Sequence, residues 1–146
     1  MSVSIFLVKF SLDSSGAYFD GKSDLIESVT MPSDLFHQIV AKTEGVQLSQ
    51  LEIFEDESRR KNFQIDCYLP NDAVNLRERL RDTFLDTIRK SAGEVGSASI
   101  NQLEVKILEA IIGKFKALTN FDALLTKKLE FFRNDDSMVV RVDANE

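Results

Sequence analysis

Two arginines one helical turn apart, Arg77 and Arg81, are the residues of this chain whose type and spacing best suit a chemical role. They fall within the apolar arc of a predicted helix, so we expect both side chains to be partly buried. Two neighbouring guanidinium groups can clamp a phosphate or a carboxylate. The basic run Arg59, Arg60 and Lys61 could join them in a site for an anion or an acidic partner.

A structural role for these basic residues is the alternative. The guanidinium groups of Arg77 and Arg81 can extend past the edge of the core into water, or pair with a carboxylate such as Asp66 or Glu78. The basic run follows an acidic one, and together the two runs can serve as a solvated hairpin tip. The sequence leaves both interpretations open.

Residue types that support catalysis or metal binding are scarce. His37 is the single histidine and lies three residues after Asp34, a spacing typical of an ordinary surface pair. Cys67 is the single cysteine and sits in an apolar run, which favours a buried thiol. The six glycines form no nucleotide-binding loop. We therefore expect no catalytic residue, no cofactor and no metal, although the sequence leaves a modest carboxylate-based enzyme open.

Composition indicates one globular unit. A chain of 146 residues with 43% hydrophobic content suits a single α+β domain spanning residues 1–146. The absence of a basic leader and of a long apolar run predicts a cytoplasmic location and no membrane contact. A net charge of −6 argues against nucleic acid as the main partner, because phosphate backbones attract basic surfaces.

Two similar proline-containing segments define the expected architecture. Met31-Pro32-Ser33-Asp34 and Leu69-Pro70-Asn71-Asp72 each join an extended run to an amphipathic one. Proline at a helix start, followed by Ser or Asn and Asp that can cap free N–H groups, is typical of a strand that leads into a helix. The pattern predicts possible tandem ββα units over residues 1–45 and 46–92.

Hydrophobic periodicity supplies the remaining elements. The pattern predicts strands at 3–11, 25–31, 46–55 and 62–69, and helices at 32–43, 71–91 and 99–118. We expect a connection with at most a short strand between residues 13 and 24, and a helix break over 93–99. At the end of the chain we expect a helical turn at 121–125 and then a hairpin of strands near 129–133 and 138–142. The sheet should be mostly antiparallel, with five or six strands.

The helix predicted at 99–118 has an unusually wide apolar stripe. Leu108 and Ile112 flank the ridge formed by its other large apolar residues. A stripe of this width needs two packing partners. One should be the sheet, and the other is either the preceding helix or the same helix of a second subunit, which would make Leu108 and Ile112 an oligomer interface.

The missing catalytic set and the wide stripe favour a noncatalytic protein-interaction module that associates with itself, as an adaptor or scaffold. Its partner would be another protein or a second copy in a homodimer. The first alternative is a protein that binds a small molecule or an anion, or an enzyme, built around Arg77 and Arg81. The second is an accessory nucleic-acid-associated factor that uses residues 59–61.

Overall fold

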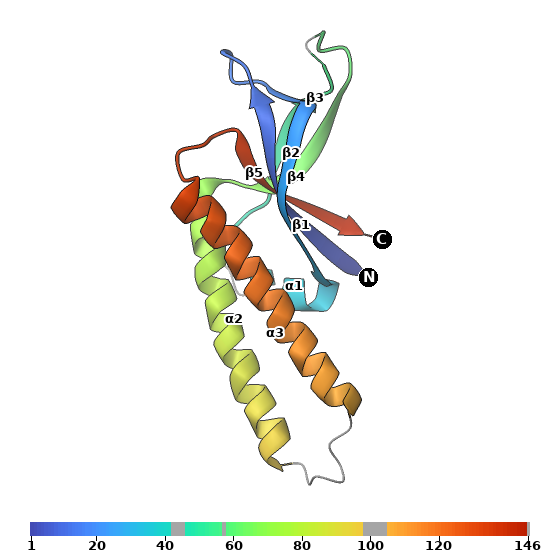
Figure 1. The fold of residues 1–146 in the computed structure, drawn as a ribbon, viewed down its shortest axis with the longest axis vertical. Coiled ribbons are helices and arrows are strands. Elements are labelled where there is room, and N and C mark those ends of the chain that lie inside the picture. Colours follow the sequence, from blue (N-terminus) through green and yellow to red (C-terminus); the bar gives the residue numbers. More distant parts are fainter. Residues whose placement is uncertain (42–45, 57, 98–104, 146) are drawn as a thin grey trace.

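The computed structural model describes residues 1–41, 46–56, 58–97 and 105–145, and shows an α+β fold with three helices and a five-stranded mixed sheet (Figure 1). The elements in chain order are β1 (Ser2–Leu12), β2 (Tyr18–Pro32), α1 (Ser33–Ala41), β3 (Ser49–Phe54), β4 (Asn62–Tyr68), α2 (Pro70–Ser97), α3 (Val105–Thr126), the π-helical segment η1 (Lys127–Phe131) and β5 (Met138–Asn145). The order β1-β2-α1 followed by β3-β4-α2 agrees with the predicted pair of ββα units.

The strands form a closed barrel in the order β1-β2-β3-β4-β5, in which β5 pairs with β1. Four of the five pairings are antiparallel. The exception is β2 with β3, which are parallel and paired only at Tyr18 with Ile53 and at Phe19 with Phe54. A mostly antiparallel sheet was predicted correctly, but this short parallel pairing makes it mixed.

Strand β2 corrects the expectation of a connection between residues 13 and 24. The strand already begins at Tyr18 and pairs with β1, with register shifts between Leu7 and Val8 and between Lys9 and Ser11. The polar composition of residues 20–24 resembles a loop because these side chains are exposed on a bulged part of the strand. Extra residues in one strand increase the local twist, which helps a small sheet to close.

The main core lies between the sheet and the helices. Residues on the inner half of α3 pack against β1, β2, β4 and β5, and the ring of the fully buried Phe121 lies 6.5 Å from that of Phe36 on α1. The α3 residues in this core are Ala117, Leu118, Phe121, Leu124 and Leu125. Each helix therefore has at least part of its length fixed to the barrel.

A second, smaller cluster fills the barrel interior. It contains Phe10, Ile53, Ile65, Cys67 and Val139. The predicted burial of Cys67 is confirmed, and removal from water raises the pKa of its thiol. The thiol therefore acts as a small apolar group that fills space between the strands.

Both proline-containing segments lead into helices, as predicted, with α1 starting at Ser33 and α2 at Pro70. The break expected from Gly93 is wrong for residues 93–97, because α2 continues to Ser97. The two glycines of this stretch, Gly93 and Gly96, each cost about 1 kcal/mol inside a helix, which a helix of 28 residues can tolerate. Residues 98–104, with the predicted start of the third long helix, lie outside the described residues. No described helix combines the length and apolar character that a membrane span requires.

The first strand of the predicted C-terminal hairpin, near 129–133, is wrong, whereas the second, at 138–142, is confirmed as part of β5. Helix α3 extends through Thr126, and residues 127–131 form η1 in place of a strand. Alternation of buried Leu129 with exposed Phe131 imitates a strand, although it arises here from one π-helical turn. The buried Lys128 ammonium donates hydrogen bonds to the carbonyls of Phe132 and Asp135, at 3.1 and 2.7 Å, and so fixes the turn into β5.

Truncation of Phe121 tests the position of the main core. We expect Phe121→Ala to reduce the free energy of unfolding by about 3–5 kcal/mol, because it leaves a cavity where the helices meet the sheet. The matched control is Phe131→Ala, which truncates an exposed phenylalanine and should change stability by less than about 0.5 kcal/mol. Urea unfolding of both variants measures the difference, and equal losses would contradict the described packing.

Candidate functional site

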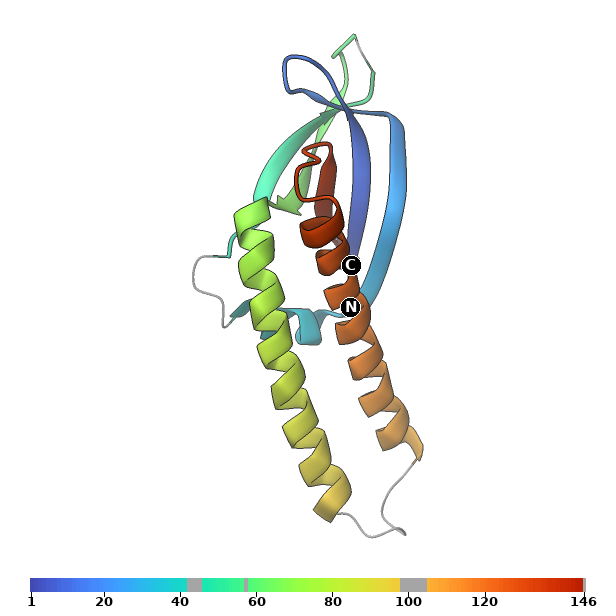
Figure 2. The ribbon, with the colours of Figure 1, turned by 60° about the vertical axis from the view of Figure 1, so that its left-hand side comes forward.

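Helices α2 and α3 extend well beyond the barrel as a two-helix arm (Figures 1 and 2). Among the residues whose burial is described, the last buried one on α2 is Thr83 and the first on α3 is Ala117. We call residues 84–97 and 105–116 the arm. At 1.5 Å per residue its helices project for about 21 and 18 Å. In the described part of the chain, α1 approaches one side of the arm near the barrel, where Gln38 and Thr87 line the same hollow. The outer part of the arm is a pair of helices.

A single contact fixes the relative height of the two helices in the arm. The rings of Phe84 and Phe115 lie 5.4 Å apart between the helices. The two helices run in opposite directions. With distance from the barrel, residue numbers therefore rise along α2 and fall by the same amount along α3. Ile88 thus lies at the height of Ile111, within one residue of Ile112, and Ala92 lies within one residue of the height of Leu108.

Six large aliphatic side chains are exposed on the described residues of the arm, and five of them lie on one side. We call these five the outer face, and they are Leu85, Ile88, Val105, Leu108 and Ile112. The sixth, Ile107, is 40% exposed and lies about 100° round α3 from Leu108. On α3, helical geometry places Leu108 and Ile112 about 180° from the side that packs on the sheet. The outer face therefore points away from the barrel.

A shallow groove between the helices continues the outer face toward the barrel. Its volume is about 440 Å³, and it is lined by Leu80, Arg81, Phe84, Leu85, Thr119 and Asp122. The opposite side of the arm differs in chemistry, because a hollow of about 340 Å³ there is lined mainly by polar residues such as Thr83, Thr87, Lys90 and Lys114. The apolar surface is thus concentrated on one side.

Leu108 and Ile112 lie on this outer face, with Ile112 62% exposed. Packing within the same chain, which includes one of the two explanations of the wide stripe, covers most of Leu108, which is 36% exposed, and leaves most of Ile112 in water. The other explanation, an interface with a second subunit, stays a prediction.

The structure separates Arg77 from Arg81 by giving each its own carboxylate. Arg77 is 17% exposed and donates a hydrogen bond from Nη1 to Glu130 Oε1 at 3.1 Å. Arg81 is 56% exposed, so the expectation of partial burial is wrong for it, and its Nε donates to Asp122 Oδ1 at 2.9 Å. The suggested partners Asp66 and Glu78 are replaced by carboxylates more than forty positions away. An anionic ligand would have to compete with these carboxylates.

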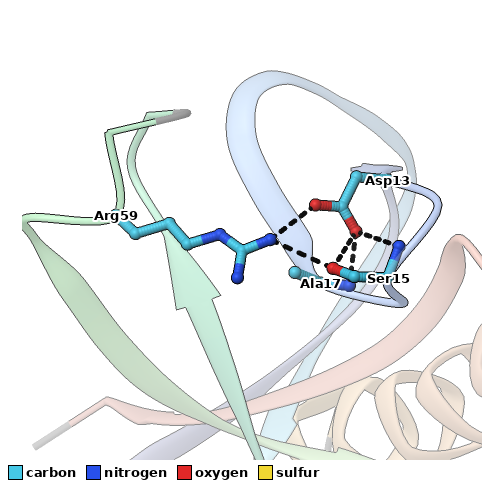
Figure 3. A network of polar contacts seen from close by, with 4 residues as sticks. All are labelled: Asp13, Ser15, Ala17 and Arg59. Carbon is cyan, nitrogen blue, oxygen red and sulfur yellow. Dashed lines mark hydrogen bonds and ion pairs between the residues drawn. The ribbon is translucent and has the colours of Figure 1, made fainter.

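Arg59 joins two loops at the far end of the barrel (Figure 3). Its guanidinium donates hydrogen bonds to Asp13 Oδ2 at 2.8 Å and to Ser15 Oγ at 3.0 Å. It also lies within 6 Å of the ring centres of Phe19 and Phe54, a cation–π arrangement. The side chain thus ties the two loops together at the wall of a hollow of about 610 Å³, which Asp13, Phe19 and Arg59 help to line.

Arg60 and Lys61 follow at the exposed tip between β3 and β4. The structure does not bring residues 59–61 together with the arginines of α2. Arg59 bonds Asp13, whereas Arg77 and Arg81 bond carboxylates that follow α2 in the chain. The basic residues therefore form two separate groups in the fold.

Other chemistry is sparse in the described part of the chain. No group of three or more His, Cys, Asp or Glu residues there is placed to hold a metal ion. His37 is exposed on α1, and its ring contacts that of Phe36 at 6.1 Å. The outer face of the arm is the surface feature that most needs an explanation.

Comparisons of the chain with protein-family models, with curated proteins and with solved structures find no match.

Sequence reasoning did not find the carboxylates that pair with the arginines, since Asp13, Asp122 and Glu130 are all distant in sequence from their partners. The signal that was available for Asp13 is local. Asp13, Ser15 and Gly16 have the composition of a turn in which a carboxylate accepts hydrogen bonds from the following residues.

The Asp13 carboxylate gives a testable pH dependence. Hydrogen bonds from the Ser15 hydroxyl, the Ala17 and Ser15 amides and Arg59 lower its pKa from 3.8 to about 2. A pKa lowered by folding adds stability above the ordinary value, and this stability is lost as the pH falls toward 2. We expect Ser15→Ala to raise the Asp13 pKa more than Arg59→Ala, because the Ser15 hydroxyl has the largest effect. An NMR titration of the carboxyl carbon measures both shifts, and the reverse order would contradict this network.

Proposed function

We propose that this protein is a noncatalytic protein-interaction module that associates with itself through the outer face of the α2–α3 arm. The observation that carries the proposal is the set of five exposed aliphatic side chains on the side of the arm that faces away from the barrel. An adaptor or scaffold role follows, in which the barrel bodies are held at a fixed distance by paired arms.

Energetic considerations support this use of the arm. Complete burial of one aliphatic side chain is worth about 1.5–3 kcal/mol, so the five from each of two copies could offset the entropy cost of association. Two helices alone cannot shield an apolar side, whereas four helices enclose one in a bundle. A second copy supplies the two missing helices with the same apolar pattern.

The anion-binding alternative has less support. Both arginines on which it depends already have carboxylate partners within 3.1 Å. An accessory role with nucleic acid is also weakly supported, because Arg59 bonds Asp13 and leaves Arg60 and Lys61 as the exposed basic residues of that hairpin tip. An anionic ligand would have to displace the carboxylates that already pair with both arginines of the anion site. A nucleic acid would have few exposed basic residues to contact at the hairpin tip.

Light scattering coupled to size exclusion tests the proposal. We expect a dimer both at about 0.1 M and at about 1 M salt, although the Debye length falls from about 10 to 3 Å, because apolar burial is not screened. Ile112→Lys should give a monomer by placing a charge in the interface. The matched control is Leu25→Lys, at a residue 56% exposed on β2, which should leave the dimer intact.

Three results would contradict the proposal. They are a wild-type monomer at both salt concentrations, a dimer that Ile112→Lys does not affect, and a dimer that Leu25→Lys disrupts equally. Far-ultraviolet circular dichroism of each variant shows that the fold is retained, as expected for exposed positions.

A further inference from the structure

We infer that the two copies associate about a two-fold axis parallel to the arm, so that α2 of each copy lies against α3 of the other along the outer face. This inference rests on the proposed function and specifies its geometry. It is carried by charged residues at the edges of the outer face, which the apolar residues alone do not explain.

At the edges of the outer face, α2 and α3 each have an acidic and a basic residue seven positions apart. They are Asp82, just before the arm, and Arg89 on α2, and Glu109 and Lys116 on α3, and all four are exposed. A seven-residue spacing keeps the two charges on one side of a helix, about 10.5 Å apart. Helical geometry places each pair at the edge of the outer face that is remote from the neighbouring helix. Arg79 and Asp86 have the same spacing on α2 but lie about 60° further round the helix from the outer face. In coiled coils, residues at such edges select the partner and its orientation.

The charges have opposite order on the two helices. From the barrel toward the tip, α2 has acid and then base, whereas α3 has base and then acid. The Phe84–Phe115 contact places Lys116 within about one residue of the height of Asp82, and Glu109 within about one residue of that of Arg89. Each height therefore has one positive and one negative charge.

A two-fold axis parallel to the arm preserves these heights. It places Lys116 against Asp82 of the other copy and Glu109 against Arg89 of the other copy, which gives four ion pairs in the dimer. The same operation brings Ile112 within about one residue of the height of Ile88 of the other copy, so these two apolar residues meet near the middle of the arm. Neighbouring helices across the interface are antiparallel, as in a four-helix bundle.

The competing two-fold arrangement has its axis across the arm, with the tips pointing in opposite directions. It can pair Asp82 with Arg89 of the other copy, and Lys116 with Glu109 of the other copy. For this, the axis must cross the arm at a height midway between the two charges of each helix.

This position of the axis keeps Ile112 near Ile112 of the other copy but shifts Val105 to the level of Asn120 near the barrel, so the two arms overlap over only part of their length. The parallel axis pairs the charges and also keeps the two outer faces together over their whole length.

Present contacts of these charges are weak enough to be exchanged. Within α2, Asp82 lies 3.9 Å from Arg79, and Arg89 lies 3.9 Å from Asp86, and all four side chains are substantially exposed. Pairs of this kind contribute little to stability. Re-pairing across an interface therefore costs the monomer little.

Charge-reversal variants test the arrangement through the dimer dissociation constant, measured by sedimentation equilibrium at low salt. We expect Lys116→Glu to weaken the dimer about tenfold, since it creates two repulsive contacts with Asp82. The double variant Asp82→Lys/Lys116→Glu should return to within about twofold of the wild type, because it restores opposite charges. The control Glu109→Lys/Lys116→Glu has the same net charge and should stay at least as weak as Lys116→Glu. High salt should reduce all these differences.

The outcomes separate this inference from the proposed function. A wild-type monomer overturns both. A dimer whose constant is unchanged in Lys116→Glu, or that Asp82→Lys/Lys116→Glu does not restore, overturns the arrangement and leaves self-association intact. Restoration by Glu109→Lys/Lys116→Glu also overturns it, and points to the axis across the arm.

Discussion

The fold depends on how the inner half of α3 packs against the barrel. From Ala117 to Leu125, every turn of this helix places an apolar side chain on the sheet, and Phe121 also reaches α1. This contact fixes where α3 starts to leave the barrel, and the Phe84–Phe115 pair then determines how α2 lies beside it. Since both helices are longer than the sheet they cover, their outer parts must project. The exposed arm is thus a geometric consequence of helix length.

Polar contacts join the loops at the barrel end far from the arm. The Arg59 side chain joins the β1–β2 and β3–β4 loops, and the Tyr18 hydroxyl donates a hydrogen bond to the Asp136 carbonyl at 2.7 Å, which ties in the turn before β5. These contacts hold together strands whose β2–β3 pairing is only two residues long. A short parallel seam needs such support, because two residue pairs supply few hydrogen bonds. The two ends of the molecule therefore differ in chemistry. Polar contacts within the chain join the loops at the barrel end, whereas the arm at the other end exposes apolar side chains.

Local chemistry in the sequence predicted much of the fold. The α+β class, the proline-led helix starts and the burial of Cys67 follow from patterns within a few residues. The errors arose where tertiary contacts override such patterns. The loop-like composition before Asp24 belongs to a strand because β1 pairs with it, and Leu129 and Phe131 alternate in burial because a π-helical turn follows α3. The partners of Arg77 and Arg81 depend on how α2 and α3 meet, which no local pattern contains.

The wide stripe of α3 shows how a sequence can point to an assembly. Its inner part is used within the chain, since Leu118 and Phe121 are fully buried, whereas Leu108 and Ile112 further out are 36% and 62% exposed. A monomer would gain nothing from aliphatic residues in those positions, and polar ones would serve solubility better. The cost of leaving them in water is avoided only if another surface covers them. We propose that this surface is the same face of a second copy, because the edge charges have opposite order on the two helices.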